Sequence, residues 1–296
     1  PPPPRPLLPR RRFEIAVHVA DVGHFIKAGT PLDAEVAARG TSTYLVDRRV
    51  DMVPSLLSED LCSLRAGVDR LAFTVRFEMD DRANLLSHSF AKSVIRSDAA
   101  LTYGEAQERI DDEMLDDKIT TSLRILDKLA AQLRMKRRAA GALDLSTPEI
   151  KFRLDDESRL PVELNLYQPH RTNSLIEEFM LLANITVGRA VEAAFPRSAM
   201  LRHHPPPAKT SFVELRRLLK AHKLEIDVSS PRALQNSLAK CEKPDKPDFG
   251  MLVRTMAVRS MKSAGYFPAG KVPKEEYSHF GLAIPLYTHF TSPIRR

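Results

Sequence analysis

The chain of 296 residues contains no tryptophan and only two cysteines, Cys62 and Cys241. Two cysteines cannot build a disulfide framework or a four-cysteine zinc site, so we expect both to be buried thiols. No apolar run approaches the roughly 18 residues of a membrane span, and the proline-rich start lacks the apolar core of a signal peptide. These absences predict an intracellular protein without a membrane segment.

The sequence also lacks the short motifs that bind common cofactors. It has no P-loop, no glycine-rich dinucleotide fingerprint, no nucleophile elbow and no zinc-protease motif, so we expect no nucleotide cofactor. His203 and His204 precede a run of prolines without an evident third ligand, which favours a loop over a metal site. The acidic run at residues 111–117 could hold a hard cation, but it is more simply a solvated helix start.

Net charge gives only weak guidance about partners. The chain has 45 Lys and Arg against 38 Asp and Glu, a net charge of +7. Residues 1–12 alone hold four arginines, six prolines and no acid, which leaves +3 for the remainder. Because such a composition cannot pack a core, we predict a disordered leader over residues 1–12. The positive charge is then no strong sign of nucleic-acid binding.

Hydrophobic periodicity predicts strands first and helices later. Apolar residues alternate from Phe13 onwards and again over residues 71–79, where the second face is polar, which indicates an antiparallel sheet. Shorter strands are expected at residues 43–46, 89–95, 150–154 and 162–166. Helices are expected at residues 118–139, from Ser174, from Ser211 and over 248–266. With no repeat and no long linker, the pattern predicts one compact α+β domain over residues 13–296, with an antiparallel or mixed sheet core and packed helices.

The helix expected from Ser174 carries two polar candidates for a site. Glu177, Leu181 and Asn184 fall at i, i+4 and i+7, so one face could line a polar cleft. Glu177 would also be the third residue of a capping box that opens at Ser174. Spacing alone favours the capping role.

The C-terminal run YTHFTSPIRR, residues 287–296, is the most distinctive stretch. Arg295 and Arg296 offer forked donors for phosphate oxygens, and the aromatic residues before them offer flat faces for bases. A nuclease that degrades a single strand needs both. By composition alone, a surface loop with an arginine pair is the stronger alternative.

Seven blocks of sequence follow one another along the chain. They are VHVADVGHFIKAGTPLD, TYLVDRRVDMVPSLLSEDLCSLRAGVDRLAF, RSDAALTYGEAQ, GALDLSTPEIKF, NSLIEEFMLLANITV, LRHHPPP and YTHFTSPIRR. In this order, from Phe13 to Arg296, they resemble the catalytic RNB domain of the ribonuclease II family, and most closely its members that serve the eukaryotic RNA exosome. The resemblance implies the RNB fold, truncated here at both ends.

The resemblance implies processive, hydrolytic 3′-to-5′ degradation of single-stranded RNA to nucleotides, with Mg²⁺ as cofactor. It also implies exosome core subunits as possible partners and a location in the nucleus, the cytoplasm or both. Tyr44 matches an aromatic residue that stacks on a base. Tyr103 and Glu177 match positions that contact the 3′-terminal ribose.

The other site residues that the resemblance implies are the two C-terminal arginines and Asn184, which is on the same predicted helix as Glu177. Arg295 matches the arginine that clamps the scissile phosphate, and Arg296 and Asn184 are expected to bind RNA beside it. We therefore expect Glu177 and Arg295 to converge on one cleft. Leu145 replaces the second stacking aromatic of bacterial members, so a two-sided sandwich on the last base is not expected.

The chain departs from the family at the metal site. Where the family carries an Asp-rich loop that holds Mg²⁺, just before the strand from Phe13, this sequence reads PPPPRPLLPRRR. Asp21, Asp47 and Asp51 belong to other blocks, so no metal ligand is assigned. Two hypotheses follow: an exoribonuclease by descent, or a non-catalytic RNA-binding or exosome-scaffolding fragment without the metal-binding aspartates.

Overall fold

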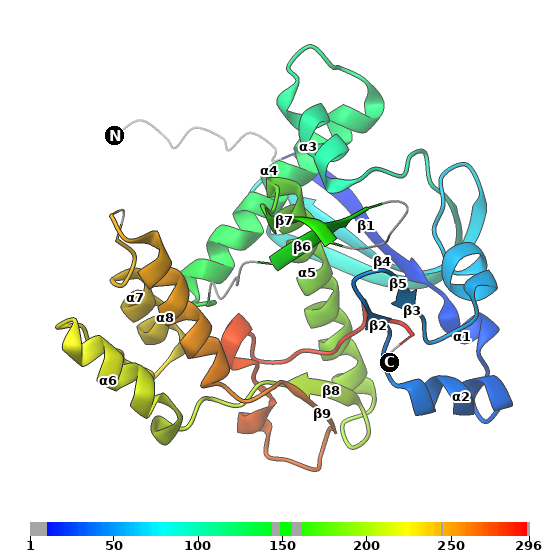
Figure 1. The fold of residues 1–296 in the computed structure, drawn as a ribbon. Coiled ribbons are helices and arrows are strands. Elements are labelled where there is room, and N and C mark those ends of the chain that lie inside the picture. The colour runs from blue at the N-terminus through cyan, green and yellow to red at the C-terminus, as the bar shows by residue number, and fades with distance from the viewer. Residues whose placement is uncertain (1–10, 144–148, 156–160, 244, 295–296) are drawn as a thin grey trace, which may run out of the picture. The chain divides into compact units, whose positions relative to one another are not determined.

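The computed structural model describes residues 11–143, 149–155, 161–243 and 245–294. The chain divides into two compact units, each assembled from separate stretches of sequence. Unit 1 comprises Pro1–Leu133, Pro169–Ala183 and Thr291–Arg296, and unit 2 comprises Arg134–Gln168 and Asn184–Phe290. Figure 1 labels the helices and strands of both units.

The sheet of unit 1 has three antiparallel strands in the order β1 (Arg12–Ala20), β4 (Asp69–Asp80) and β5 (Leu85–Arg96) (Figure 1). The alternation seen in the sequence gives β1 and β4 a shared apolar face. Ile15 and Val17 lie opposite Phe77 and Val75, and all four side chains are buried. Both predicted strands are confirmed, because cross-strand apolar pairs on one face bury each other.

The polar face predicted for β4 is not fully exposed, because Thr74 on that face is also buried. Its hydroxyl lies 2.7 Å from Nδ1 of His18 and 2.5 Å from the hydroxyl of Ser93. A buried hydroxyl with two hydrogen-bond partners carries little desolvation penalty. Burial, followed by the charge of Arg76, lowers the pKa of His18.

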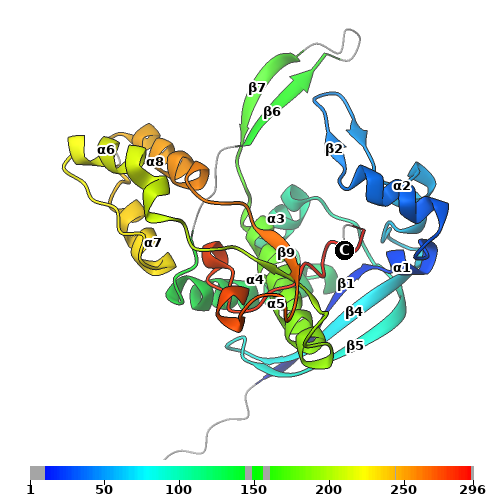
Figure 2. The same ribbon diagram turned by 90° about the horizontal axis from the view of Figure 1, so that it is seen from below.

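The other elements of unit 1 are short helices, one hairpin and parts of two long helices. They are α1 (Val22–Phe25), α2 (Pro31–Arg39), β2 (Thr43–Tyr44), β3 (Arg49–Val50), the π-helical segment η1 (Leu56–Leu61), α3 (Tyr103–Asp111), α4 (Lys118–Ala139) and α5 (Arg171–Ala194). Helices α4 and α5 both continue into unit 2. Figure 2 shows the hairpin that begins with β2 standing clear of the strands of the sheet.

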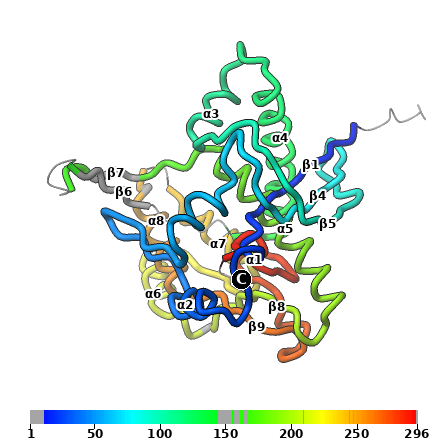
Figure 3. The backbone as a smooth tube through the Cα atoms, turned by 90° about the vertical axis from the view of Figure 1, so that its right-hand side faces the viewer, coloured from blue at the N-terminus to red at the C-terminus, as the bar shows by residue number. Residues whose placement is uncertain are grey.

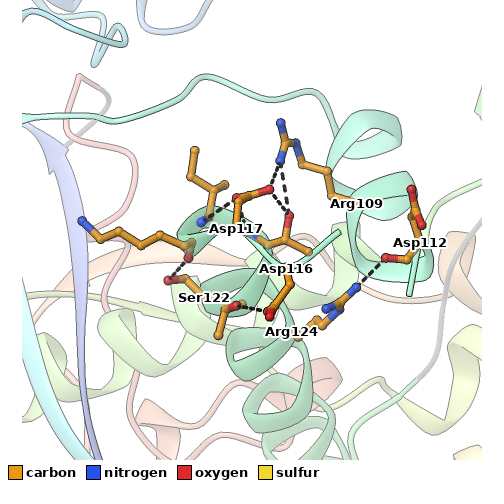
Figure 4. A network of polar contacts seen from close by, with 10 residues as sticks. Arg109, Asp112, Asp116, Asp117, Ser122 and Arg124 are labelled. Carbon is orange, nitrogen blue, oxygen red and sulfur yellow. Dashed lines mark hydrogen bonds and ion pairs between the residues drawn. The ribbon is translucent and has the colours of Figure 1, made fainter. Parts of the chain in front are cut away.

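Helix α4 has the bounds that the sequence predicts, and Asp117 explains its start. The Oδ1 atom of Asp117 accepts the backbone N–H groups of Ile119 and Thr120 at 2.8 and 3.0 Å (Figure 4). Hydrogen bonds from Thr120 are the largest cause that lowers the pKa of Asp117 to about 2. The acidic run at residues 111–117 thus includes a helix cap, as predicted.

Unit 2 contains two two-stranded sheets and a group of helices, which Figure 3 follows along the backbone. Its elements are β6 (Glu149–Leu154), β7 (Pro161–Tyr167), β8 (Met200–His203), the 3-10 segment η2 (Lys209–Phe212), α6 (Val213–Ala221), α7 (Pro231–Ala239), α8 (Pro247–Arg259), β9 (Gly265–Pro268), η3 (Lys274–Tyr277) and η4 (Phe280–Leu282). Helices α6, α7 and α8 share an apolar core. Leu219, Leu234 and Val253, one from each helix, are fully buried in it together with Phe212.

The α+β class with antiparallel pairing is confirmed, and most element positions agree with the sequence pattern. The helix predicted over residues 248–266 is too long, because α8 ends at Arg259 and Tyr266 belongs to β9. The helix predicted from Ser211 begins at Val213, after a 3-10 turn. No helix among the described residues combines the length and apolar composition that a membrane-spanning segment needs.

Two further expectations concern the cysteines and the leader. Cys241 is buried as expected, but Cys62 is only partly buried, and burial raises the pKa of both thiols. Residues 1–10 of the predicted leader lie outside the described residues. Strand β1 begins at Arg12, one residue before the predicted start, and the Arg12 guanidinium pairs with Glu78 at 3.1 Å.

Candidate nucleic-acid interface

The β2–β3 hairpin of unit 1 presents Tyr44 to solvent. Tyr44 lies opposite Arg49 in the hairpin, and its side chain is 77% exposed. Arg49 donates to Asp51 at 2.5 Å, and the Ser58 hydroxyl donates to the same carboxylate at 2.7 Å, which ties the base of the hairpin to η1. The bond from Arg49 is the largest cause that lowers the pKa of Asp51. An exposed aromatic ring on an anchored hairpin is suited to stack on a base.

Tyr103 is the first residue of α3 and is 43% exposed. The preceding Thr102 forms a capping box with Glu105, which fixes where the helix starts. The hydroxyl of Thr172, at the start of α5, donates to the carbonyl of Tyr103 at 2.8 Å. The Thr172 backbone N–H donates to the side-chain oxygen of Gln107 at 3.2 Å. Two bonds therefore join the start of α3 to the start of α5.

Glu177 lies in the second turn of α5 with its side chain exposed, while the neighbouring Glu178 and Phe179 are buried. The capping box predicted at Ser174 is wrong, because α5 begins at Arg171 and Ser174 lies inside the helix. The Asn173 side chain instead accepts the backbone N–H of His170 at 2.8 Å, just before the helix. Glu177 is thus outside the capping positions, which removes the capping role that its spacing favours.

Thr172 joins helices α3 and α5, a contact that no motif in the sequence predicts. It is 2% exposed and binds an atom 69 residues away in the chain. Through the bonds of Thr172, the helix that carries Tyr103 and the helix that carries Glu177 are held together within unit 1. No local pattern could indicate this role, because a threonine near a helix start is usually read as a cap.

Asn184 is buried, with 2% of its surface exposed, and it belongs to unit 2. Its side-chain amide donates to the hydroxyl of Tyr287 at 3.2 Å, and its carbonyl accepts the backbone N–H of Thr288 at 3.5 Å. These contacts hold the YTHF segment against α5. A direct contact between Asn184 and RNA stays a prediction, and its burial favours a supporting role.

Arg295 and Arg296 lie outside the described residues, so the expected convergence of Glu177 and Arg295 stays a prediction. The residue before them, Ile294, packs in unit 1 against a small apolar cluster with Val36, Met52 and Val53. A cavity of about 200 Å³ beside this cluster is lined by Asp51, Met52 and Ile294 among others. Within unit 1, the described part of the C-terminal segment therefore ends at Ile294, beside Met52 and Val53, which follow the hairpin that carries Tyr44.

His203 and His204 lie in and next to strand β8 rather than in the predicted loop. Nδ1 of His204 accepts the backbone N–H of Gly281 at 3.0 Å, and Nε2 lies 2.8 Å from the carbonyl of Lys262. Nδ1 is therefore unprotonated and Nε2 donates. Both ring nitrogens therefore form hydrogen bonds with backbone groups. Burial is the largest cause that lowers the pKa of His204.

The described residues do not fit Mg²⁺. Among them, no group of three or more His, Cys, Asp and Glu side chains is placed to hold a metal ion. Asp21 pairs with Lys92 at 3.0 Å, Asp51 pairs with Arg49, and Asp117 caps α4. Hard cations need several convergent carboxylate or carbonyl oxygens, and these carboxylates are engaged elsewhere.

The family model described as the RNB domain matches residues 5–296. The chain is 46% identical over 291 residues to the exosome complex exonuclease dis3 of Schizosaccharomyces pombe. It is 48% identical over 284 residues to the exosome complex exonuclease RRP44 of Homo sapiens. These matches cover 98% and 96% of this chain but 30% and 29% of the relatives, so the chain spans about 30% of the length of the curated relatives it matches.

Solved structures show the same fold. The apo form of Mycoplasma genitalium RNase R matches with a TM-score of 0.83 at 25% identity, over 98% of this chain and 44% of that chain. Yeast Ssd1, whose structure is described as that of a pseudonuclease, matches with a TM-score of 0.77 at 22% identity, over 96% of this chain and 34% of that chain. The likeness to Ssd1 concerns the fold alone.

Proposed function

Because the chain belongs to the RNB domain family, we propose that it forms part of a hydrolytic 3′-to-5′ exoribonuclease that acts on single-stranded RNA. The observation that carries this proposal is the identity of 46–49% to exosome exonucleases over nearly the whole chain. By the same argument the chain associates with exosome core subunits, in the nucleus or the cytoplasm.

In this proposal, unit 1 holds the 3′ end of the RNA. Tyr44 stacks on a base, since its ring is exposed on an anchored hairpin. Tyr103 and Glu177 contact the terminal ribose, and their exposure on two helices that are joined through Thr172 supports this role. A carboxylate and a phenol can both form hydrogen bonds with a 2′-OH. A protein can distinguish RNA from DNA by this group.

Arg295 and Arg296 supply the phosphate contacts of the proposal. A guanidinium can donate two parallel hydrogen bonds to one phosphate, which fixes the reacting group as well as neutralising it. The packing of Ile294, the residue before the pair, against Met52 and Val53 supports this role. Asn184 contributes indirectly, because its side-chain amide donates to the Tyr287 hydroxyl and so holds Tyr287 in the same segment.

Divalent metal supplies water activation and leaving-group stabilisation in such hydrolysis. The donor set of the described residues does not fit Mg²⁺, so we assign no residue of this chain to it. This poor fit favours a second candidate function, a non-catalytic RNA-binding or exosome-scaffolding module. The two candidates share the RNA contacts and differ in whether bound RNA is shortened.

A gel assay with 5′-labelled oligo-RNA, with Mg²⁺ or with EDTA, separates the two candidates. We expect the chain to bind the RNA but to shorten it at least about a thousandfold more slowly than an intact relative. Losing several kcal/mol of metal-dependent stabilisation has that effect, at about 1.4 kcal/mol per tenfold. Robust, EDTA-sensitive shortening from the 3′ end would contradict our conclusion about the metal donors. Absence of RNA binding would contradict both candidates.

A second arm of the assay tests the ribose contacts. An oligonucleotide whose last residue is 2′-deoxy should bind more weakly than the all-RNA oligonucleotide, because the 2′-OH contact is lost. Glu177→Gln should reduce this discrimination, and Glu108→Gln, which changes an exposed acid on α3, is the matched control. Equal discrimination by wild type and Glu177→Gln would remove Glu177 from the site.

A further inference from the structure

Unit 2 holds an arginine whose side chain is fixed but not neutralised. Strands β8 and β9 form the two-stranded sheet seen in Figures 1 and 2. Arg202 of β8 lies directly opposite Tyr266 of β9 in its register, so both side chains project from the same face of this sheet. The Arg202 guanidinium lies over the Tyr266 ring, 4.9 Å from its centre, and Nη1 donates to the Tyr266 hydroxyl at 2.8 Å. Stacking and hydrogen bonding thus orient the guanidinium before any ligand arrives.

His289 completes this cluster. Its Nδ1 lies 2.7 Å from the Tyr266 hydroxyl and 3.4 Å from Nη1 of Arg202. Because Nη1 of Arg202 is a donor only, the Tyr266 hydroxyl accepts from Arg202 and donates to His289. His289 lies in the YTHF segment, so the cluster also joins that segment to β9.

No carboxylate among the described residues lies within ion-pair distance of Arg202. Its side-chain contacts in that part of the chain all use Nη1 or the guanidinium face. The Nε–Nη2 edge, with its parallel N–H donors, therefore has no acceptor there. That edge is the one that matches two oxygens of a phosphoryl or carboxylate group.

The charge of Arg202 is felt by its neighbours. It contributes to lowering the pKa of His204 and to lowering the pKa of His279 to about 4, in both cases after desolvation by burial as the largest cause. It also acts against the rise in the pKa of the buried Tyr287 hydroxyl. A cation that shifts several neighbouring groups is poorly screened, and such a place attracts anions.

We propose that Arg202, oriented by Tyr266 and His289, binds the phosphoryl group of a nucleotide at a site on the β8–β9 sheet of unit 2. The choice of a phosphoryl ligand rests on the proposed RNA substrate, and two sources supply it. One is the phosphodiester of an RNA strand, and the other is the monoester of a nucleoside 5′-monophosphate released by hydrolysis. Two oxygens of either group match the Nε–Nη2 edge.

Calorimetric titration of the chain with inorganic phosphate and with adenosine 5′-monophosphate tests the site, and anisotropy with a labelled oligo-RNA tests the phosphodiester. Arg202→Gln should weaken binding of at least one of these probes by about 10- to 100-fold, the range for a charge-assisted bond. Arg202→Lys should recover only part of the loss, because it keeps the charge without the fork. Arg189→Gln, which changes an exposed arginine on α5, is the control and should bind as wild type.

The pattern of losses identifies the source of the phosphoryl group. Loss confined to phosphate and the mononucleotide assigns a monoester site, and loss confined to oligo-RNA assigns a backbone contact. Unchanged binding of all three probes by both Arg202 variants overturns the proposal, as does equally tight binding of acetate. Neither measurement needs hydrolysis. A chain that binds phosphate through Arg202 but never shortens RNA would therefore favour the non-catalytic candidate and leave this inference standing.

Discussion

Unit 1 and unit 2 balance their charges differently. Unit 1 contains 21 Lys and Arg against 23 Asp and Glu, a net charge of −2, although it includes the four arginines of the leader. Unit 2 contains 24 against 15, a net charge of +9. The positive charge of the chain therefore belongs to unit 2, whereas residue order alone suggests that the leader supplies most of it.

Arg202 differs from the paired arginines of both units, because Arg254 in unit 2 also pairs with a carboxylate, that of Glu242. In unit 1, Arg70 donates to Asp60 at 2.6 Å and Arg96 donates to Asp69 at 2.7 Å, so their charges are neutralised within the fold. Arg202 in unit 2 instead contacts the side chains of Tyr266 and His289. A neutralised arginine stabilises the fold modestly, but an oriented arginine without a carboxylate keeps its donors for a ligand.

The largest expected effects test whether the two units have separate cores. Phe77 in the sheet of unit 1 and Phe212 in the helical core of unit 2 are both fully buried. Phe77→Ala and Phe212→Ala should each lower the free energy of unfolding by about 3–5 kcal/mol, through lost burial and the cavity that remains. Urea denaturation followed by circular dichroism measures both.

Hydrogen exchange then shows where each substitution acts. Phe212→Ala should lower the protection of amides in α6, α7 and α8 and leave those of β1 and β4 nearly unchanged, and Phe77→Ala should do the reverse. Leu115→Ala, at a site that is 36% exposed, is the control and should have a small effect on either unit. Equal loss of protection in both units after either substitution would mean that they unfold together.

The sequence predicted elements well where burial follows one period. In β1 and β4, strict alternation matched a sheet with one buried face, and in α4 the three- and four-residue spacing matched the observed bounds. The prediction over residues 248–266 was wrong because the helix is capped at Ser260 and the following strand β9 forms through its pairing with the distant strand β8. The start of α5 was misplaced because Asn173, rather than Ser174, carries the local hydrogen bond that precedes the helix.

Family motifs predict the candidate site residues. They do not predict the residues that hold other side chains in place through contacts between distant parts of the sequence. Tyr44 and Tyr103 could be named from their blocks, and their exposure agrees with a binding role. Thr172 and Arg202 could not be named, because their partners lie far away in the sequence. The cross-strand pair of Arg202 and Tyr266 depends on the register of β8 with β9, which no local spacing encodes.

Acid should weaken unit 2 before it weakens the α4 cap of unit 1. Desolvation, followed by the charges of His204 and Arg202, lowers the pKa of His279 from 6.5 to about 4. A histidine that is neutral in the fold stabilises it above pH 6.5, and this contribution, on the order of 3 kcal/mol, is lost as the pH falls from 6.5 to about 4. The contribution of Asp117 is present above about pH 3.8 and is lost only as the pH falls through about 2.

Unfolding free energies measured from pH 7.5 to 4 check this difference. His279→Asn is the diagnostic variant, because an amide oxygen can still accept the Leu282 backbone N–H that Nδ1 now accepts at 3.3 Å, but it does not titrate. The variant should show a flatter profile between pH 6.5 and 4. An unchanged profile would assign the acid sensitivity of unit 2 to other groups, with the buried His204 the first to examine.

Binding of single-stranded RNA should separate stacking in unit 1 from ionic contacts. Tyr44→Ala should weaken binding by about 1–3 kcal/mol, the usual value for one base on an aromatic ring, and leave the salt dependence almost unchanged. Tyr44→Phe, the control, should bind nearly as wild type. Arg295→Ala should weaken binding and reduce the slope of log K against log salt by about 0.7, the share of one phosphate on a single strand. Anisotropy at three salt concentrations measures both quantities.

Other outcomes of the binding experiment would assign the RNA interface to a different part of the chain. If neither substitution changes affinity while deletion of residues 1–12 abolishes it, RNA is held by the basic leader. If the slope falls instead with Arg202→Gln, the ionic contact belongs to unit 2, as its net charge suggests. In that case unit 1 would contribute stacking, and unit 2 would contribute most of the salt dependence.

The smallest changes in the free energy of unfolding are expected when one helix cap in each unit is removed. The Thr102 hydroxyl accepts the Glu105 backbone N–H in unit 1, and the Glu105 carboxylate accepts the Thr102 backbone N–H in return. The Ser230 hydroxyl accepts the Ala233 backbone N–H in unit 2 without such a return, because Ala233 has no polar side chain. Each replacement by Ala should lower the free energy of unfolding by about 1 kcal/mol. Thr102→Ala should cost more of this free energy, because it also loosens Glu105, whose pKa the bonds to Thr102 lower.

The control variants Thr102→Ser and Ser230→Thr keep the cap hydroxyls, so they should leave the free energy of unfolding nearly unchanged. A larger loss from Ser230→Ala than from Thr102→Ala would show that the reciprocal bond adds no stability.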